Sequence, residues 1–291
     1  MENNRVNDKR GIIWFLVLTF GLTWAVEFGV FYSGLNPGQA GGIAVLTLVM
    51  FFPALSAFIV RKFVTREGFG DAGLRVGIKK YYLAAWFGMP LMTLVSLGLA
   101  LALGLAQWDL SLSGMAKFLG SEQPVPPSPI DPRLMILANA VGAILIAPWI
   151  NIIPSFGEEF GWRGFLQVKL AHLGRFRAYL YTGLIWGVWH APIIAKGHNY
   201  PDHPYLGIGA MIIFCVLLAF IFGWLRDASG SVWVAALAHG SLNASAGLPY
   251  MVTRDFNTLL GPALTGLTGW IVMALAVAWL ARRGAFGRAE R

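Results

Sequence analysis

Long apolar stretches recur along the chain at intervals that are typical of a polytopic membrane protein. Each of eight runs has about 20 residues, which is enough to cross a hydrocarbon core about 30 Å thick as a helix. The runs cover approximately residues 11–33, 41–60, 82–105, 134–153, 178–195, 206–225, 231–250 and 262–281. The fourth and seventh contain polar residues within the run or at its ends. The pattern predicts an all-α membrane protein with about eight transmembrane helices.

The composition supports this interpretation, and the positions of the basic residues explain the charge. Of the 291 residues, 57% are hydrophobic and 12% charged, whereas soluble domains carry about 25% charged residues. The net charge of +8 could indicate nucleic-acid binding. With an inside amino terminus and eight crossings, however, 18 of the 22 Lys and Arg residues fall on the inner side. Because this is the positive-inside rule, we expect membrane lipid and no nucleic acid as partner, both termini in the cytoplasm, and the bacterial inner membrane as location.

The longest segment between predicted spans runs from about residue 107 to 132 and contains the sequence PVPPSPIDP. Its prolines disfavour regular helix, so we expect a stiff external linker. The linker divides the chain into a three-span region, residues 1–132, and a five-span region, residues 133–291. The three amino-terminal spans contain almost no ionisable residue. Any chemistry is therefore expected in the second region, in a core at about residues 140–250. The single cysteine, Cys215, excludes an intrachain disulfide and a cysteine-based metal site.

Three clusters of polar residues interrupt the apolar runs of the second region. Charged side chains at membrane depth are costly unless they face a partner or a cavity, so each cluster is a functional hypothesis. In a helix, Glu159 and Arg163 share a face and can pair, while Glu158 points about 100° away. Such a pair alone is also typical of a solvated helix face, but the second carboxylate beside it favours a site. The clusters are Glu158, Glu159 and Arg163 in SFGEEFGWRGF, His190 in WGVWHAP, and His239 and Asn243 in AHGSLNA.

The spacing of these clusters from the inner ends of their spans predicts one common depth. Glu158, His190 and His239 lie 11, 13 and 13 residues from the basic residue that marks the inner end of each span. At about 1.5 Å per residue, all three are roughly 16–20 Å from the cytoplasmic ends of their helices. Pro192 removes a backbone hydrogen bond and can kink the helix beside His190. We therefore expect the three segments to share an intramembrane active-site cavity.

The residue types in these clusters suit hydrolysis by an activated water. A glutamate in an apolar cavity can take a proton from water and return it to a leaving amine, which is the role expected for Glu158. His190 can hold or polarise the same water. Peptide hydrolysis also needs donors aimed at the oxyanion, and His239 and Asn243 can supply an imidazole N–H and an amide N–H. No serine stands beside a base as a nucleophile would, which disfavours an acyl-enzyme.

The motif Glu-Glu-x-x-x-Arg, an aromatic residue ahead of a histidine, and His-x-x-x-Asn follow one another in this order. This pattern resembles the CPBP family of intramembrane proteases, which includes CAAX prenyl endopeptidases and bacteriocin-processing relatives. The resemblance covers about residues 140–250 and implies an eight-helix fold. The chain departs from the family pattern at Trp186, where phenylalanine is usual. The implied catalytic residues are Glu158 as general base, Glu159 and Arg163 as its supports, and His190, His239 and Asn243 in water-binding or oxyanion roles.

Members of this family are often described as metalloproteases, which raises the question of zinc. Glu158, His190 and His239 could bind zinc and leave an open position for water. The sequence has no His-Glu-x-x-His motif, and a mechanism that uses the glutamate alone requires no metal. We therefore expect no required cofactor, with zinc as the alternative.

Two other functions use the same residue types. A proton-coupled transporter also places Glu and His at membrane depth, but such carriers usually have internal repeats, and the sequence shows none. A non-catalytic immunity or chaperone protein on the same fold would not need all six motif residues. The preferred function is an intramembrane endopeptidase that acts from the cytoplasmic side of the bilayer. Its expected substrate is a hydrophobic peptide or a lipidated protein, and prenylated proteins are among the candidates.

Two further motifs have simpler explanations. The sequence GFGD, residues 68–71, imitates the Gly-x-Gly-Asp motif of aspartyl intramembrane proteases. It lies in a basic loop, however, and no predicted span supplies a partner aspartate. His198 and His203 could bind a metal on the outer side, but an exposed loop is the simpler interpretation.

Overall fold

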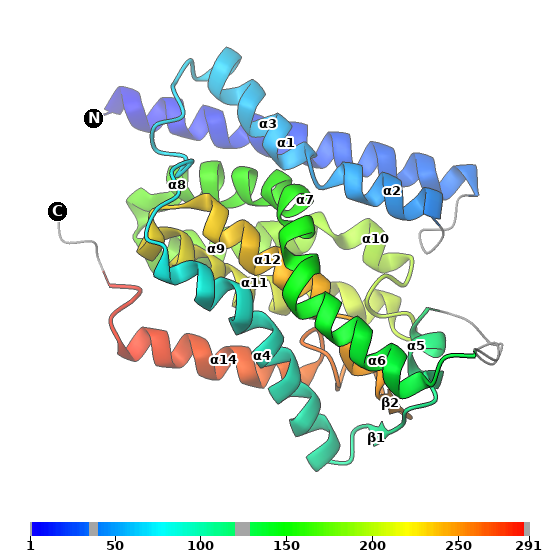
Figure 1. Ribbon diagram of the computed structural model, residues 1–291. Coiled ribbons are helices and arrows are strands. Elements are labelled where there is room, and N and C mark those ends of the chain that lie inside the picture. Colours follow the sequence, from blue (N-terminus) through cyan, green and yellow to red (C-terminus); the bar gives the residue numbers. More distant parts are fainter. Residues whose placement is uncertain (1, 35–39, 120–128, 288–291) are drawn as a thin grey trace.

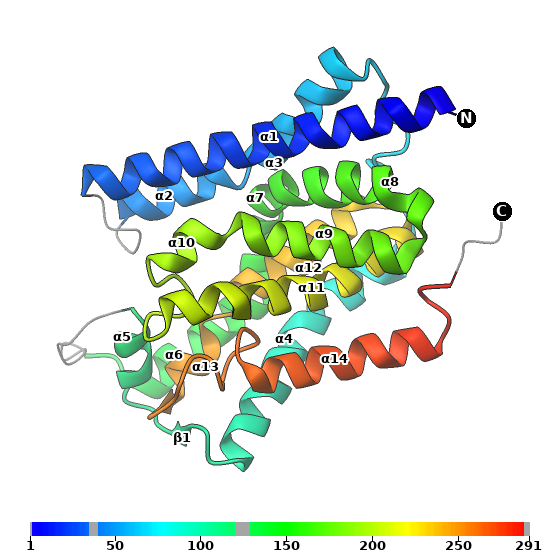
Figure 2. The same cartoon turned by 180° about the vertical axis from the view of Figure 1, so that it is seen from behind.

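Helices make up nearly all of the regular structure in the computed structural model, which describes residues 2–34, 40–119 and 129–287. The first helices are α1 (Glu2–Ser33), α2 (Ala40–Val49), α3 (Phe52–Ile59) and the π-helix η1 (Val60–Val64). They form one outer layer, in which α2 and α3 lie beside α1 (Figures 1 and 2). On the opposite side, α4 (Lys80–Ala102) packs against α14 (Leu267–Arg282). The amino-terminal end of α1 and the carboxy-terminal end of α14 lie on the same side of the molecule (Figure 1).

The helices between these layers come from the second half of the chain. The central helix is α12 (Val232–Ser245), which packs against α4, α7 (Ala147–Gly161) and α11 (Pro204–Ser229). The pair formed by α9 (Arg175–Trp189) and α11 lies beside it (Figure 2). The remaining elements are α5 (Ser113–Phe118), α6 (Pro132–Val141), η2 (Gly142–Ile146), η3 (Trp162–Leu166), α8 (Gln167–Leu170), η4 (Ala171–Leu173), α10 (Ala191–Ala195), α13 (Leu248–Met251), β1 (Gln107–Trp108) and β2 (Thr253–Arg254), the two strands being antiparallel.

Five helical stretches in the described part of the chain are long and apolar enough to cross a membrane. They contain the predicted spans at 11–33, 134–153 and 206–225 and overlap most of those at 41–60 and 82–105, and the longest runs without a break from Pro132 to Leu173. The other three predicted spans are shorter helices of 15, 14 and 16 residues, namely α9, α12 and α14. The span predicted at 178–195 is divided because α9 ends at Trp189 and Pro192 lies in the first turn of α10. The structure therefore has the long apolar helices of an all-α integral membrane protein, but it does not confirm the count of eight.

The predicted linker is described only in part, because residues 120–128 lie outside the described residues. Its first half contains β1 and the six-residue helix α5, so it is not without helix. At its end, the Asp131 side chain caps α6 by accepting a hydrogen bond from the Arg133 backbone N–H at 2.8 Å. Pro132 follows as the first residue of that helix, a position where its missing N–H costs nothing.

Glycines allow α7 to approach two neighbouring helices closely. A Cβ atom on Gly157 would lie 2.6 Å from the Met50 carbonyl oxygen, and one on Gly161 would lie 2.4 Å from the Pro53 side chain. These two glycines are four residues apart on one face, as in small-residue contacts between membrane helices. On the other side, a Cβ on Gly240 of α12 would lie 2.9 Å from the Pro148 carbonyl oxygen. The α7 backbone is therefore held between α3 and α12, which fixes the direction of the side chains between Gly157 and Gly161.

Candidate active site

The two glutamates of α7 are buried inside the helix bundle. Glu158 is 3% exposed and Glu159 is fully buried. Glu159 Oε1 accepts a hydrogen bond from Arg163 Nη1 at 2.9 Å. The His239 ring contacts the same oxygen through Nδ1, also at 2.9 Å. The first and third sequence clusters are therefore joined at one carboxylate oxygen, and the Glu159–Arg163 pair predicted from helical spacing is present.

Glu158 is held by two indole groups instead of by a cation. Its Oε2 accepts hydrogen bonds from Trp186 Nε1 at 2.7 Å and from Trp162 Nε1 at 3.4 Å. Within the described residues, Oε1 accepts no hydrogen bond. Glu158 thus has one oxygen fixed by the protein and one available to a further ligand such as water.

The His190 side chain is oriented by the end of its own helix. Its Nδ1 lies 2.8 Å from the Trp186 carbonyl oxygen. Because a carbonyl can only accept, Nδ1 carries the hydrogen, and in the neutral ring Nε2 is left with a lone pair. The residue is half-buried, and Cys215 Sγ lies 3.8 Å from Nδ1. His190 therefore presents Nε2 as a proton acceptor.

Trp186 connects the clusters to one another. Its indole N–H reaches Glu158, its ring lies 4.4 Å beneath the Arg163 guanidinium, and its centroid is 5.5 Å from that of the His239 ring. The His190 ring is 5.8 Å away. In the sequence, Trp186 stands out by its departure from the usual phenylalanine. That departure was the available signal, because a phenylalanine at this position has no N–H to donate.

Arg163 is incompletely paired although it is fully buried. Its Nη1 binds Glu159, but Nε and Nη2 have no hydrogen-bond partner in the described part of the protein. Glu159 Oε2 is likewise enclosed without a partner. Buried polar atoms are almost always satisfied, so each exception needs an explanation, and a catalytic role is one of these. These unused atoms favour a functional site over a purely structural ion pair.

Asn243 is placed differently from the other predicted site residues. It lies on α12, four residues after His239, but its side chain is exposed. It makes no hydrogen bond to any described residue. The structure therefore brings Glu158, Glu159, Arg163 and His239 together around Trp186, adds His190 at the edge, and leaves Asn243 out of the network.

A buried carboxyl group in α1 was not singled out by sequence analysis. Glu27 is 3% exposed, and its Oε2 has no hydrogen-bond partner among the described residues. It continues a buried polar stripe that includes Thr23, whose hydroxyl accepts a hydrogen bond from Trp189 Nε1 at 2.9 Å. The first three spans were expected to contain almost no ionisable residue, and Glu27 is the exception. An acidic residue inside the run 11–33 was the signal that could have identified it.

The residues predicted as zinc ligands are not gathered into a metal site in this arrangement. The described residues contain no group of three or more His, Cys, Asp or Glu side chains placed to hold a metal. Glu158 Oε2 is bound by two indoles and Nδ1 of both histidines is used within the protein, so the atoms left for an ion are Glu158 Oε1 and the two Nε2 atoms. In the loop between α10 and α11, His203 Nε2 is 2.9 Å from Asn257 Nδ2, so this ring also has a protein partner.

Comparison with known protein families identifies one matching segment. Residues 140–245 match the family model of type II CAAX prenyl endopeptidases of the Rce1-like group. The matched segment extends from α6 to the end of α12 and contains all six predicted site residues. Curated proteins show no match to the chain.

Proposed function

Residues 140–245 form an Rce1-like domain of the CPBP family, and from this premise we propose that the protein is an intramembrane endopeptidase of the CAAX type. Its substrate is a membrane-associated peptide or lipidated protein, and its nucleophile is a water activated by Glu158. One observation carries the proposal. Glu158 is buried, is held through Oε2 by two indoles, and has Oε1 free of hydrogen bonds to described residues, while the Trp186 ring that binds it also contacts the His190 and His239 rings.

In the proposed reaction, Glu158 Oε1 accepts a proton from water as the water oxygen attacks the scissile carbonyl carbon. The tetrahedral intermediate carries its negative charge on the former carbonyl oxygen. Collapse of the intermediate breaks the C–N bond, and the proton held by Glu158 moves to the leaving amine. His190 Nε2 is the second acceptor on the water and fixes its orientation.

His239 and Asn243 are the proposed donors to the oxyanion. Because His239 Nδ1 is directed at Glu159, Nε2 is the ring atom left for the substrate. It donates only in the doubly protonated ring, whose positive charge then lies beside the Glu159 carboxylate. Asn243 is exposed one turn away, where a bound peptide rather than the protein would complete its hydrogen bonds. Electrostatic stabilisation of this kind is commonly the largest catalytic contribution.

The proposal includes the topology expected from the sequence. Eight crossings require α9 with α10, α12 and α14 to cross as short helices beside the five long ones. The amino-terminal end of α1 and the carboxy-terminal end of α14 lie on the same side of the molecule, which supports an even number of crossings (Figure 1). Together with the distribution of basic residues, this supports cytoplasmic termini. The proposed location is the bacterial inner membrane, where lipid surrounds the protein.

Peptide cleavage by the purified full-length protein tests the proposal. Matched hydrophobic peptides with and without a prenylated cysteine are incubated with the protein in lipid nanodiscs, and the products are identified by mass spectrometry. We expect one defined cleavage in at least one peptide, and the same rate after treatment with a zinc chelator. Intact peptides under all conditions would refute endopeptidase activity, and chelator-sensitive cleavage would refute the metal-free form of the mechanism.

A further inference from the structure

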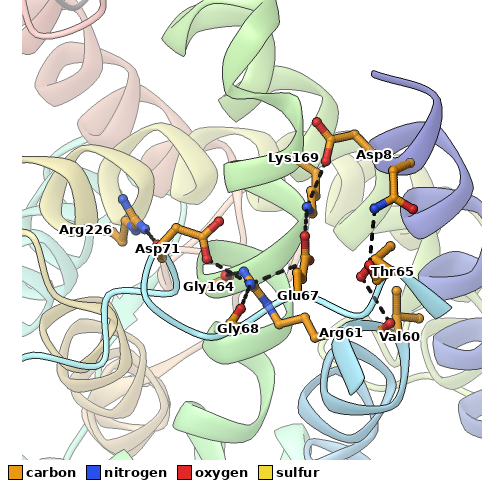
Figure 3. A network of polar contacts seen from close by, with 11 residues as sticks. Asp8, Val60, Arg61, Thr65, Glu67, Gly68, Asp71, Gly164, Lys169 and Arg226 are labelled. Carbon is orange, nitrogen blue, oxygen red and sulfur yellow. Dashed lines mark hydrogen bonds and ion pairs between the residues drawn. The ribbon is translucent and has the colours of Figure 1, made fainter. Parts of the chain in front are cut away.

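The loop of residues 65–79, between η1 and α4, contains the GFGD sequence that the proposed reaction does not use. Arg61, the second residue of η1, is fully buried beneath this loop. Its Nη1 donates to the Gly68 carbonyl oxygen at 2.6 Å and lies 2.8 Å from Asp71 Oδ1. The first and last residues of GFGD therefore close around one guanidinium group, as Figure 3 shows. The motif is a binding loop for Arg61, not part of an aspartyl protease site.

The same guanidinium holds the helical stretch that carries the two catalytic carboxylates. Arg61 Nη2 donates to the Gly164 carbonyl oxygen at 3.0 Å (Figure 3). Gly164 belongs to the π-helix η3, which directly follows α7 and contains Arg163. A π-helical turn is rare and frequently marks a functional site. A donor from outside the helix therefore restrains the segment whose geometry is least fixed by regular helical hydrogen bonds.

Close backbone contact accompanies this hydrogen bond. A Cβ on Gly164 would lie 3.2 Å from the Ala72 carbonyl oxygen, so loop and π-helix touch where the glycine leaves room. The Phe165 ring packs against the Arg61 guanidinium at 5.4 Å. The loop is therefore attached to η3 through charge, a hydrogen bond and packing at once.

The other half of the loop binds the beginning of α12. The Gly73 carbonyl oxygen accepts a hydrogen bond from the Val232 N–H at 2.8 Å, and the Leu74 carbonyl oxygen accepts one from Trp233 Nε1 at 3.1 Å. The Ile78 N–H donates to the Ser229 carbonyl oxygen at 2.9 Å. Because α12 also carries His239, one loop contacts two of the three helical segments that supply the candidate site.

A third attachment joins this loop to α1. Lys169 of α8 contacts Asp8 Oδ1 at 2.8 Å and also binds the Glu67 carboxylate (Figure 3). The amino-terminal layer, the loop and the end of the catalytic helical stretch are thereby connected in one polar network.

We propose that the loop of residues 65–79, closed around Arg61, is a clamp that sets the position of the α7–η3 stretch relative to α12. The contact that it protects is the 2.9 Å bond between Glu159 and His239, which joins these two segments. Arg61 touches no reacting atom and is a positioning residue. Its effect on rate rests on the proposed function, because a misplacement of about 1 Å can lower a catalytic rate about a hundredfold.

Substitution of Arg61 by lysine tests the clamp in the full-length protein. A single ammonium group cannot reproduce the planar fork that reaches Gly68, Asp71 and Gly164 together. Hydrogen–deuterium exchange in nanodiscs, measured without substrate, is expected to rise severalfold in residues 158–168 and 230–240 and to stay unchanged in α14. On a cleaved peptide, we expect kcat to fall about ten- to a hundredfold with KM near the wild-type value.

Lys62→Gln is the matched control for this experiment. Lys62 is the neighbouring cation in η1, is exposed, and makes no hydrogen bond to a described residue. Its substitution should leave both exchange and kcat at wild-type values. Gly164→Ala is the second test variant, since its added methyl presses on the Ala72 carbonyl and leaves Arg61 intact. It should reproduce the local rise in exchange even if Arg61→Lys fails to fold.

Three outcomes would overturn the clamp. They are wild-type exchange in both segments, an equal rise in α14, and full kcat in a folded Arg61→Lys protein. Because exchange needs no substrate, a wild-type protein that cleaves no peptide would refute the proposed function and leave the clamp open to test.

Discussion

Two ionic clusters lie along the helical stretch formed by α7, η3 and α8, and they differ in their access to water. In the Glu159–Arg163 cluster, both side chains are fully buried. In the Arg61–Asp71 cluster, Arg61 is buried but the Asp71 side chain is 51% exposed. Each cluster has buried atoms without a hydrogen-bond partner among the described residues, Arg61 Nε included, but Arg163 donates only to Glu159, whereas Arg61 donates to two backbone carbonyls and a carboxylate.

This difference in burial indicates different roles for the two clusters. A pair whose carboxylate is half-exposed is partly screened by water and contributes less to stability, but its buried cation can orient backbone segments. A buried pair is costly to desolvate and is weak evidence for stability, so its retention needs another reason. The fully buried cluster, in which Arg163 has a single hydrogen-bond partner, therefore has the properties expected of a reaction site, and the half-exposed cluster those of a support.

The largest effect is expected for Glu158→Gln. Glutamine keeps the size of the side chain but cannot take a proton from water, so kcat should fall about 10²- to 10⁴-fold. The thermal unfolding transition should stay close to that of the wild type, because glutamine still offers an oxygen to both indoles. Cleavage rates normalised to folded protein measure the effect, and an undiminished rate would remove Glu158 as the base.

The two single variants Glu159→Gln and Asp71→Asn test whether the two clusters differ in their contribution to stability. Loss of Glu159 leaves the Arg163 guanidinium buried without a carboxylate, which should lower the free energy of unfolding by about 3–5 kcal/mol. Loss of the exposed Asp71 charge should lower it by no more than about 1 kcal/mol. Denaturant titrations in the same detergent compare the variants. Equal losses would show that burial does not separate the clusters.

A smaller effect is expected for Trp186→Phe. The substitution removes the indole N–H from Glu158 but retains an aromatic ring, so kcat should fall about tenfold, in line with the loss of one hydrogen bond to a charged group. Trp189→Phe is the control, because its indole N–H binds Thr23 and not a carboxylate. If both variants lose the same activity, packing rather than the hydrogen bond is responsible.

The smallest effect on stability is expected for Asn243→Ala. The side chain is exposed and has no hydrogen-bond partner among the described residues, so the free energy of unfolding should change by less than about 0.5 kcal/mol. A decrease in kcat would then report on the bound substrate alone. Wild-type kcat would exclude Asn243 from the oxyanion site.

Sequence patterns were sufficient for the features that depend on periodicity. Apolar runs indicated the long helices, the four-residue spacing indicated the Glu159–Arg163 pair, and Pro192 marked the position where α9 gives way to α10. These features are local, because helical geometry alone relates the residues involved.

Features that depend on how helices cross could not be predicted in the same way. The hydrogen bond from Trp186 to Glu158 joins residues 28 positions apart on α9 and α7, and it depends on how these helices cross in the bundle. The binding of Arg61 by the GFGD loop and the exposure of Asn243 also depend on tertiary packing. Periodicity gives the face on which a residue lies, but the partner atom is set by tertiary packing. Glu27 is different, since its position in an apolar run was visible and only its significance was missed.

The central claim is that Glu158 activates a water that attacks the peptide directly. A single-turnover reaction in water labelled with ¹⁸O, analysed by mass spectrometry of both product and protein, tests it most directly. We predict that the new carboxylate of the product carries one labelled oxygen after the first turnover and that the protein fragment containing Glu158 carries none. Label in that fragment, together with an unlabelled first product, would mean that the carboxylate itself attacks the substrate and would contradict the account.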